Sequence, residues 1–259
     1  MNRRHALVTG ASSGIGREFA VQLASLGYVI TGVARGEVQL QALVAELPGY
    51  GHQYCVADLG TDSGVQAVID VLSKQHFTLL INNAGYSALQ PFYRSELALQ
   101  QDMFNVNCGA LATLAHVFLG QSQSGDALVN VASIVSYLPT PAQAMYSASK
   151  AFISTLSECL WEEQRNRGVY VMGLCPGVTQ TGFIARASGG EAVGRPLLAI
   201  FIQTAREVVD EALLALEQRK KAIVVTGRIN RLLMLLPRVL SRHRLIRLLG
   251  RIGDPEGVL

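Results

Sequence analysis

The sequence predicts a single α/β domain, residues 1–259, in which helices cover both faces of a doubly wound parallel sheet in three αβα layers. Short, nearly continuous apolar runs alternate with helical patterns, as they do in parallel sheets that are buried on both faces. Each run ends in small or polar residues, and such strand ends meet at one crevice of a parallel sheet. No linker rich in Pro, Gly or Ser comes before about residue 181, and no internal repeat is present, which favours one domain over two.

Six strands follow from these runs, with helices between them. The expected strands are residues 5–10, 28–35, 53–58, 77–85, 126–133 and 169–177. Helices are expected near residues 15–26, 38–47 and 65–72, and a helical segment separates each later pair of strands. Repeated strand–helix–strand units with right-handed crossovers give the doubly wound arrangement.

Composition favours a globular protein of a reducing compartment. Apolar residues make up 49% and charged residues 16% of the chain, which is enough for a sizeable core and gives no sign of disorder. The four cysteines form no CxxC pair, which argues against a disulfide framework or a zinc site. We see no signal peptide and no apolar stretch of the ~18 residues that span a bilayer, so a cytoplasmic location is expected.

A glycine-rich turn follows the first strand and suits a dinucleotide. Gly10, Gly14 and Gly16 have the spacing GxxxGxG, whereas most dinucleotide folds have GxGxxG. Glycines allow a close approach of the backbone, and the start of the following helix offers free N–H groups to a pyrophosphate. An ordinary structural turn is the alternative for the motif alone. Its place after the first strand favours the cofactor.

The second strand ends at Arg35, where an acid would accept a hydrogen bond from the 2′-hydroxyl of an unphosphorylated ribose. An arginine instead suits a 2′-phosphate, and Arg17 could help to bind it. NADP(H) is therefore favoured over NAD(H), with a solvated loop arginine as the alternative. Asp58, at the end of the third strand, is expected to bond the adenine amino group or else to cap the next turn.

Tyr146 and Lys150 are four residues apart and lie on one face of a predicted helix. Ser133, at the end of the preceding strand, is expected to meet them across the crevice, and Asn107 is a helix asparagine that packing alone does not require. An ammonium group lowers the pKa of a nearby phenol, and a shift of about three pH units corresponds to roughly 4 kcal/mol. A tyrosine and a lysine at this spacing are common in helices and indicate little alone. Their position after the serine-bearing strand is what makes the pattern specific.

This arrangement predicts a proton transfer coupled to hydride transfer. Tyr146 would donate a proton to a carbonyl oxygen as hydride reaches the carbon, and Ser133 would hydrogen-bond the oxygen on which charge develops. Lys150 would also hold the nicotinamide ribose, and Asn107 would anchor a water that resupplies the proton.

Together these residues resemble the short-chain dehydrogenase/reductase family over about residues 4–185. The motifs are TGASSGIG at 9–16, NNAG at 82–85, Asn107, Ser133, YSASK at 146–150, and Pro176-Gly177 with Thr181. The resemblance implies a Rossmann-type sheet, an NAD(P) cofactor, an Asn-Ser-Tyr-Lys tetrad, and usually a dimer or tetramer. The sequence is also similar, less specifically, to the branch of 3-oxoacyl-CoA reductases and 17β-hydroxysteroid dehydrogenases. Thr78 departs from the family, which often has Asp there.

The expected catalytic residues are Asn107, Ser133, Tyr146 and Lys150. The expected cofactor-binding residues are Gly10, Ser12, Ser13, Gly14, Ile15, Gly16, Arg35, Asp58, Leu59, Asn83, Ala84, Gly85, Tyr146, Lys150, Pro176, Gly177, Val178 and Thr181. No metal site is expected.

The end of the chain carries two further features. Residues 182–205 turn from glycine-rich to apolar, which suits a lid over a hydrophobic carbonyl compound and equally a surface loop with a packed helix. Residues 218–253 hold ten Lys or Arg and no acid, which leaves 12 basic and 19 acidic residues elsewhere, a balance of −7. The basic amphipathic extension at 227–253 would cover an oligomer interface or the core, lie on a membrane, or meet an anionic partner. Nucleic-acid binding is not expected, because no reading motif accompanies the charge.

The sequence thus predicts an NADPH-dependent carbonyl reductase, or the reverse alcohol dehydrogenase, for an apolar ketone such as an oxoacyl thioester or a steroid. A cytoplasmic homodimer or homotetramer is expected, with possible contact to a membrane periphery. The alternative is a non-catalytic, NADP(H)-binding scaffold or redox sensor. That alternative predicts loss of the tyrosine, lysine or serine, and all three are present.

Overall fold

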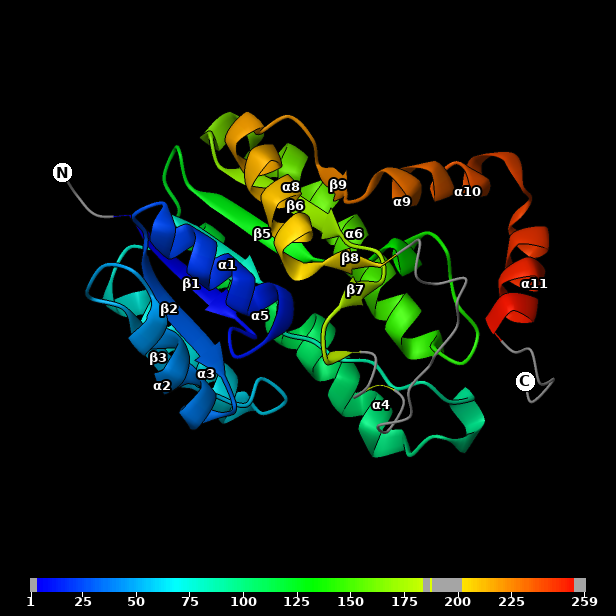
Figure 1. Ribbon diagram of the computed structural model, residues 1–259, viewed down its shortest axis with the longest axis horizontal. Helices are drawn as coiled ribbons and strands as arrows, with labels where there is room; N and C mark the ends of the chain where they lie inside the picture. Colours follow the sequence, from blue (N-terminus) through cyan, green and yellow to red (C-terminus); the bar gives the residue numbers. More distant parts are fainter. Residues whose placement is uncertain (1–3, 184–186, 188–201, 254–259) are drawn as a thin grey trace.

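The computed structural model describes residues 4–183, 187 and 202–253. Seven strands form one sheet in the order β3-β2-β1-β4-β5-β6-β9, and every neighbouring pair is parallel. Helices cover both faces of this sheet (Figure 1). The doubly wound, Rossmann-type arrangement expected from the sequence is therefore confirmed.

The strands of the main sheet are β1 (His5–Thr9), β2 (Val29–Ala34), β3 (Gln53–Val56), β4 (Leu79–Asn82), β5 (Ala127–Val131), β6 (Tyr170–Cys175) and β9 (Ile223–Val225). The helices are α1 (Gly14–Ser25), α2 (Glu37–Glu46), α3 (Asp62–Lys74), α4 (Leu97–Phe104), α5 (Leu111–Gln121), α6 (Ala144–Gln164), α8 (Ala205–Gln218), α9 (Arg228–Leu233), α10 (Leu236–Val239) and α11 (Arg242–Gly253). A two-stranded sheet joins β7 (Thr179–Gln180) to β8 (Gln203–Thr204).

All six predicted strands are present, but the sequence analysis missed β9. Its three residues, Ile223–Val225, pair with Gly173–Cys175 of β6 and form the edge of the sheet. A run this short has too few residues to show a strand period, so only its β-branched composition pointed to a strand.

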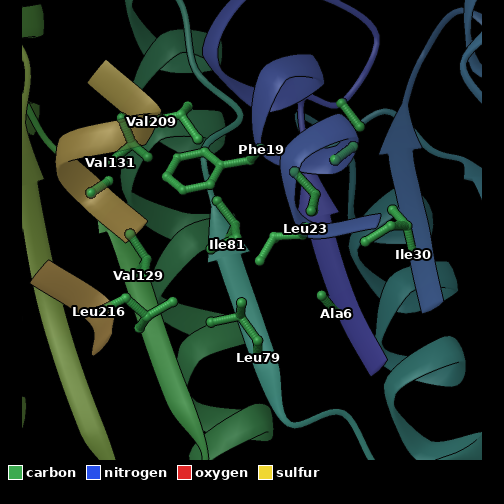
Figure 2. Close-up of a cluster of buried hydrophobic side chains, with 14 of the residues drawn as sticks. Ala6, Phe19, Leu23, Ile30, Leu79, Ile81, Val129, Val131, Val209 and Leu216 are labelled. Atoms are coloured by element: carbon green, nitrogen blue, oxygen red, sulfur yellow. The ribbon is translucent and has the colours of Figure 1, made fainter. Parts of the chain in front are cut away.

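The continuous apolar runs are explained by burial of alternate residues on opposite faces. In β4, Leu79 and Ile81 face α1 and α8, whereas Leu80 faces α3 and α5. Figure 2 shows Phe19 of α1 beside Val209 of α8 and Ile81 of the sheet, all inaccessible to solvent. One helical layer is thus fastened to the sheet by large apolar side chains.

One helical stretch corrects an expectation from the sequence. Leu97–Gln121, which runs through α4, a π-helical turn and α5, is long and apolar enough to cross a bilayer, so the expectation that no segment reaches that length is wrong. Half of the most apolar 18-residue stretch of this helical segment is buried inside the fold. Leu114 and Phe118 pack into the core beneath the sheet, and this packing accounts for the apolar face.

The strand order reverses between β2 and β4, on either side of β1. Ligands of doubly wound sheets bind at the carboxyl ends of the strands at such a reversal. The predicted lid, residues 182–205, lies largely outside the described residues, and its role stays a prediction. The basic extension forms α9, α10 and α11, which lead away from β9 (Figure 1).

Candidate active site

The glycine turn after β1 has the backbone geometry that its sequence predicts. Gly10 and Gly14 have positive φ values of 66° and 57°, which side chains with a Cβ rarely adopt. Gly16 lies in the first turn of α1, and a Cβ there would overlap the carbonyl oxygen of Gly10 and the amide of Asn83. These glycines are therefore required by the path of the chain itself, whatever else they bind.

The start of α1 is suited to an anion. Ser13 occupies the N-cap position, but its side chain makes no capping hydrogen bond, and the first turn contains no acid. The first N–H groups of a helix have no intrahelical partner and carry the positive end of the helix dipole. Ser12, Gly14 and Ile15 border the same turn and are partly accessible. The turn therefore fits a pyrophosphate.

The NNAG motif joins the glycine turn to β4. The Asn83 side chain donates to the carbonyl oxygen of Thr9 at 2.9 Å, and the Thr9 hydroxyl accepts from the backbone of Asn83 at 2.9 Å and of Ala84 at 3.0 Å. A Cβ on Gly85 would lie 2.8 Å from Asn107 Oδ1 and 3.6 Å from Lys150 Nζ. This motif therefore spans the space between the glycine turn and Lys150.

At the adenosine side of the crevice, Arg35 is exposed and, within the described chain, pairs with no carboxylate. Arg17 does not have this freedom, because its guanidinium pairs with Glu46. Asp58 Oδ1 accepts from the backbone of Gly60 at 3.0 Å, so its turn-capping role is observed, and its contact with adenine stays a prediction. Leu59, next to it, is buried.

Ser133, Tyr146 and Lys150 meet at the ends of β5 and α6. Tyr146 is 8% exposed and its phenol is hydrogen-bonded with Ser133. Lys150 is 4% exposed; its Nζ donates to the carbonyl oxygen of Val131 at 2.8 Å and lies 5.6 Å from the centre of the Tyr146 ring. The helix spacing and the strand end have thus brought the three side chains together as predicted.

The electrostatics of this group differ from the expectation. Burial raises the pKa of Tyr146 above its ordinary value, and the hydrogen bond with Ser133 opposes this only in part. Burial also lowers the pKa of Lys150 to about 8. A lowered phenol pKa is expected from Lys150 together with a cationic nicotinamide ring; in the protein alone, removal of the phenol from water is the dominant effect and acts in the opposite direction.

Asn107 is fully buried in a π-helical turn, Asn105–Ala110, between α4 and α5. Its Nδ2 donates to the Tyr86 carbonyl oxygen at 3.0 Å and to Ser149 Oγ at 3.1 Å, and its Oδ1 accepts from the Tyr86 backbone at 3.0 Å. Both amide protons are therefore used within the protein. Its side chain fixes the segment after NNAG, and the water predicted for Asn107 stays a prediction.

The Pro176–Thr181 segment follows β6 at the carboxyl end of the sheet. The Pro176 carbonyl oxygen accepts from the Ile134 backbone at 3.0 Å, and the Val178 carbonyl oxygen accepts from Gln203 at 2.9 Å. A Cβ on Gly14 would lie 3.1 Å from the Thr181 methyl group, so this segment lies against the glycine turn. At Gly177, a Cβ would overlap the Asn230 amide.

Three residues of the site were missed from the sequence. Tyr86 directly follows NNAG and donates from its hydroxyl to Asp102 Oδ2 at 2.6 Å. Ser149 lies inside the YSASK motif and joins Asn107 to the backbone of Tyr146. The Phe183 ring lies 5.7 Å from the Tyr146 ring, centre to centre. Their amino-acid types did not distinguish these three residues in the sequence. Only their short distance along the chain from the motifs could have indicated them.

The fold and the glycine turn at the strand ends are those of the Rossmann class of dinucleotide-binding folds. Residues 4–191 match the family model described as short chain dehydrogenase, which covers well over half of the chain. The chain belongs to the short-chain dehydrogenase family.

Relatives in this family carry different names. Sulfoacetaldehyde reductase 2 of Chromohalobacter salexigens is 32% identical over 192 residues, which cover 71% of this chain and 76% of the relative. A very-long-chain 3-oxoacyl-CoA reductase of Pyrenophora tritici-repentis is 34% identical over 177 residues, 64% of this chain and 52% of the relative. Inactive hydroxysteroid dehydrogenase-like protein 1 of Homo sapiens is 32% identical over 190 residues, which cover 70% of this chain and 58% of the relative. The chain thus spans little more than half the length of several relatives.

Solved structures of the family support the cofactor class. A short-chain dehydrogenase from Sphingobium yanoikuyae in complex with NADPH superposes with a TM-score of 0.78 at 31% identity, covering 86% of this chain and 87% of that one. A short chain dehydrogenase/reductase from Burkholderia phymatum in complex with NAD has a TM-score of 0.77 at 27% identity, covering 96% of each chain. Similar structures therefore bind either nicotinamide dinucleotide.

Proposed function

We propose that this protein is an NADPH-dependent carbonyl reductase, or the reverse alcohol dehydrogenase, for an apolar ketone such as an oxoacyl thioester or a steroid. The observation that carries the proposal is the group formed by Ser133, Tyr146 and Lys150 beside the glycine turn, with Asn107 behind it. Proton transfer to a carbonyl oxygen needs a positioned donor and a second hydrogen bond to the same oxygen, and Tyr146 with Ser133 supplies both.

In the reductive direction, bound NADPH supplies the hydride. Tyr146 is the proton donor, and its raised pKa keeps the phenol protonated at neutral pH, which a donor requires. Ser133 stabilises the oxygen that becomes negative. Lys150 is the only cation close to both Gly85 and the phenol ring among the described residues, so it holds the ribose end and faces the phenolate that forms.

The Tyr146→Phe variant tests the enzyme. Loss of the phenolic proton should lower turnover by about 10²–10⁴-fold, the usual contribution of a positioned acid. NADPH binding, measured by quenching of protein fluorescence, should be kept. Tyr137→Phe is the matched control, because it removes a half-buried phenol outside the group formed by Ser133, Tyr146 and Lys150, and it should leave turnover within a few-fold. Equal turnover in wild type and Tyr146→Phe would refute the mechanism.

The preference for NADPH rests on Arg35, which is exposed at the end of β2 with no acidic partner in the described chain. Arg35→Gln should lower kcat/KM with NADPH by about 10- to 100-fold relative to NADH, as expected for loss of a hydrogen bond between charged groups. Arg17→Gln, which removes an arginine already paired with Glu46, should change this ratio less. A wild-type enzyme that prefers NADH would contradict the role given to Arg35.

A non-catalytic NADP(H)-binding scaffold is the second candidate, because relatives named inactive match this chain. The presence of Ser133, Tyr146 and Lys150 favours the enzyme. Turnover of a panel of apolar and polar ketones, measured as NADPH oxidation, distinguishes the enzyme from the scaffold. Binding of NADPH with no turnover of any ketone would favour the scaffold.

Two further points of this proposal concern substrate and assembly. Phe183 packs on Tyr146, which supports an apolar substrate at the catalytic phenol. Phe104 on α4 and Phe152 on α6 are large exposed apolar side chains, which supports a homodimer or homotetramer. Sedimentation equilibrium tests the assembly, and a concentration-independent monomer mass would exclude it.

A further inference from the structure

The basic C-terminal extension, residues 227–253, forms an arm that ends beside the substrate end of the crevice. Its base is fixed by Asn230, which is buried, donates to the Thr226 carbonyl oxygen at 2.8 Å and lies against Gly177. Its last helix, α11, buries Leu245, and a Cβ on Gly250 would lie 3.6 Å from Pro141 Cγ. The arm is therefore held at both ends by the body of the protein.

Pro141 connects the arm to the rim of the active site. It belongs to the loop that leads into α6, only five residues before Tyr146. The next residue, Ala142, accepts from the backbone of Gln90 at 3.0 Å, just before the turn Phe92–Arg94 that precedes α4. In Figure 1, α11 lies at the right of the molecule and α4 in its lower part. The arm and this turn therefore belong to one rim around the substrate end.

This rim exposes apolar side chains. Leu232 in α9, Leu235 in the turn between the two helices and Val239 in α10 are 66%, 46% and 75% exposed. Phe92 and Tyr93 are exposed on the other part of the rim. Large apolar side chains grouped on a surface usually mark a contact with another molecule or with a membrane.

The same arm is strongly cationic. Its exposed arginines without a carboxylate partner in the described chain are Arg228, Arg238, Arg242, Arg244, Arg247 and Arg251. Arg231 differs, because it pairs with Glu211 at 2.7 Å. Residues 218–253 contain no acid, so no neighbour on the arm can neutralise these charges. The natural complement is therefore a surface of dense negative charge.

We propose that the arm and the rim dock this protein on an anionic lipid membrane, with the substrate end facing the bilayer. Exposed apolar side chains flanked by arginines suit shallow insertion among anionic headgroups. An aromatic residue such as Tyr93 suits the same interface. A second copy of the chain is the other possible occupant, but two copies would bring the same unpaired arginines face to face, and like charges placed against each other disfavour an interface.

Vesicle flotation tests the docking, using vesicles of phosphatidylcholine with phosphatidylglycerol and vesicles of phosphatidylcholine alone. The wild-type protein should float with the anionic vesicles at low salt and not with the neutral ones. The triple variant Arg244→Gln, Arg247→Gln, Arg251→Gln should bind the anionic vesicles on the order of a hundredfold more weakly, as expected for three arginines near a charged surface.

The matched control removes the same charge from the end of the sheet where the parallel strands begin, opposite the crevice, with Lys74→Gln, Lys220→Gln and Lys221→Gln, all exposed. This control should bind the anionic vesicles almost as wild type does. Circular dichroism should be unchanged in both variants. Because no substrate is used, the result does not depend on the proposed reductase activity.

Three outcomes would overturn the proposal. One is absence of flotation with anionic vesicles at low salt. Another is an equal loss of binding in the arm variant and in the control, which would mean attraction by net charge alone. The third is a wild-type dimer that dissociates in the arm variant without any binding to lipid, which would assign the arm to a second copy.

Discussion

Tyr146 and Lys150 are nearly inaccessible to solvent, and this burial dominates their protonation. Burying the Lys150 ammonium lowers the free energy of unfolding. The size of this cost follows from the pKa of Lys150, which burial lowers from 10.5 to about 8. Below pH 8 the folded and the unfolded chain both carry the proton, so the whole cost destabilises the fold. Between pH 8 and 10.5 the unfolded chain binds more protons, so the stability contributed by this group rises with pH.

The Lys150→Met variant should therefore be more stable than the wild type at pH 7. The burial cost is about 3 kcal/mol, and the lost hydrogen bond to Val131 offsets about 1 kcal/mol of it, so a net gain of about 2 kcal/mol is expected. Urea unfolding without cofactor at pH 7 and above pH 10.5 measures this, and the gain should vanish at the higher pH. Lys74→Met, at an exposed position, should show no such pH dependence. A less stable Lys150→Met at pH 7 would contradict the burial cost.

At the scale of elements, the crevice depends on close contact between β1, α1 and β4. Thr9 binds the backbone of Asn83 and Ala84, and the Gly16 Cα lies too close to Gly10 for any side chain. Asn107 adds a second connection, because its π-helical turn holds Tyr86. π-helical turns are frequent at functional sites. The cofactor turn and the catalytic helix are thus joined through the NNAG segment.

Gly16→Ala should weaken both the fold and the cofactor site. Its Cβ would overlap the Gly10 carbonyl oxygen, so a loss of about 1–3 kcal/mol in unfolding free energy and at least about tenfold in NADPH affinity is expected. Gly120→Ala in α5 is the control, because a Cβ there meets nothing within 4 Å. It should stabilise the fold by up to about 1 kcal/mol. Urea titration and fluorescence quenching measure the two effects, and equal behaviour of both variants would contradict the packing argument.

For the whole molecule, the two helical layers are held to the sheet by apolar packing, with the polar crevice at the strand ends. Phe19 is fully buried and packs α1 against α8 on one face of the sheet (Figure 2). Phe19→Ala should cost about 3–5 kcal/mol of unfolding free energy, because it leaves a cavity between two layers. Tyr93→Ala, at an exposed position, should change it by less than about 0.5 kcal/mol. A small effect of Phe19→Ala in urea unfolding would show that the layers repack.

The sequence by itself determined the sheet, six of its strands and the meeting of Ser133, Tyr146 and Lys150. It did so because strand period, helix period and the common edge of parallel strands are properties of the local chain. Arg35, Asp58 and the glycine turn were placed at that edge for the same reason.

Only the tertiary structure decided what depends on distant neighbours. Three contacts join residues that are far apart in the sequence: Arg17 pairs with Glu46, Asn107 uses its whole amide within the protein, and Phe183 packs on Tyr146. The strand β9 is a run too short to be predicted from its own residues. The direction of the Tyr146 pKa belongs here too. Desolvation depends on everything that surrounds a group, and the sequence shows the ammonium four residues away but not the burial that outweighs it.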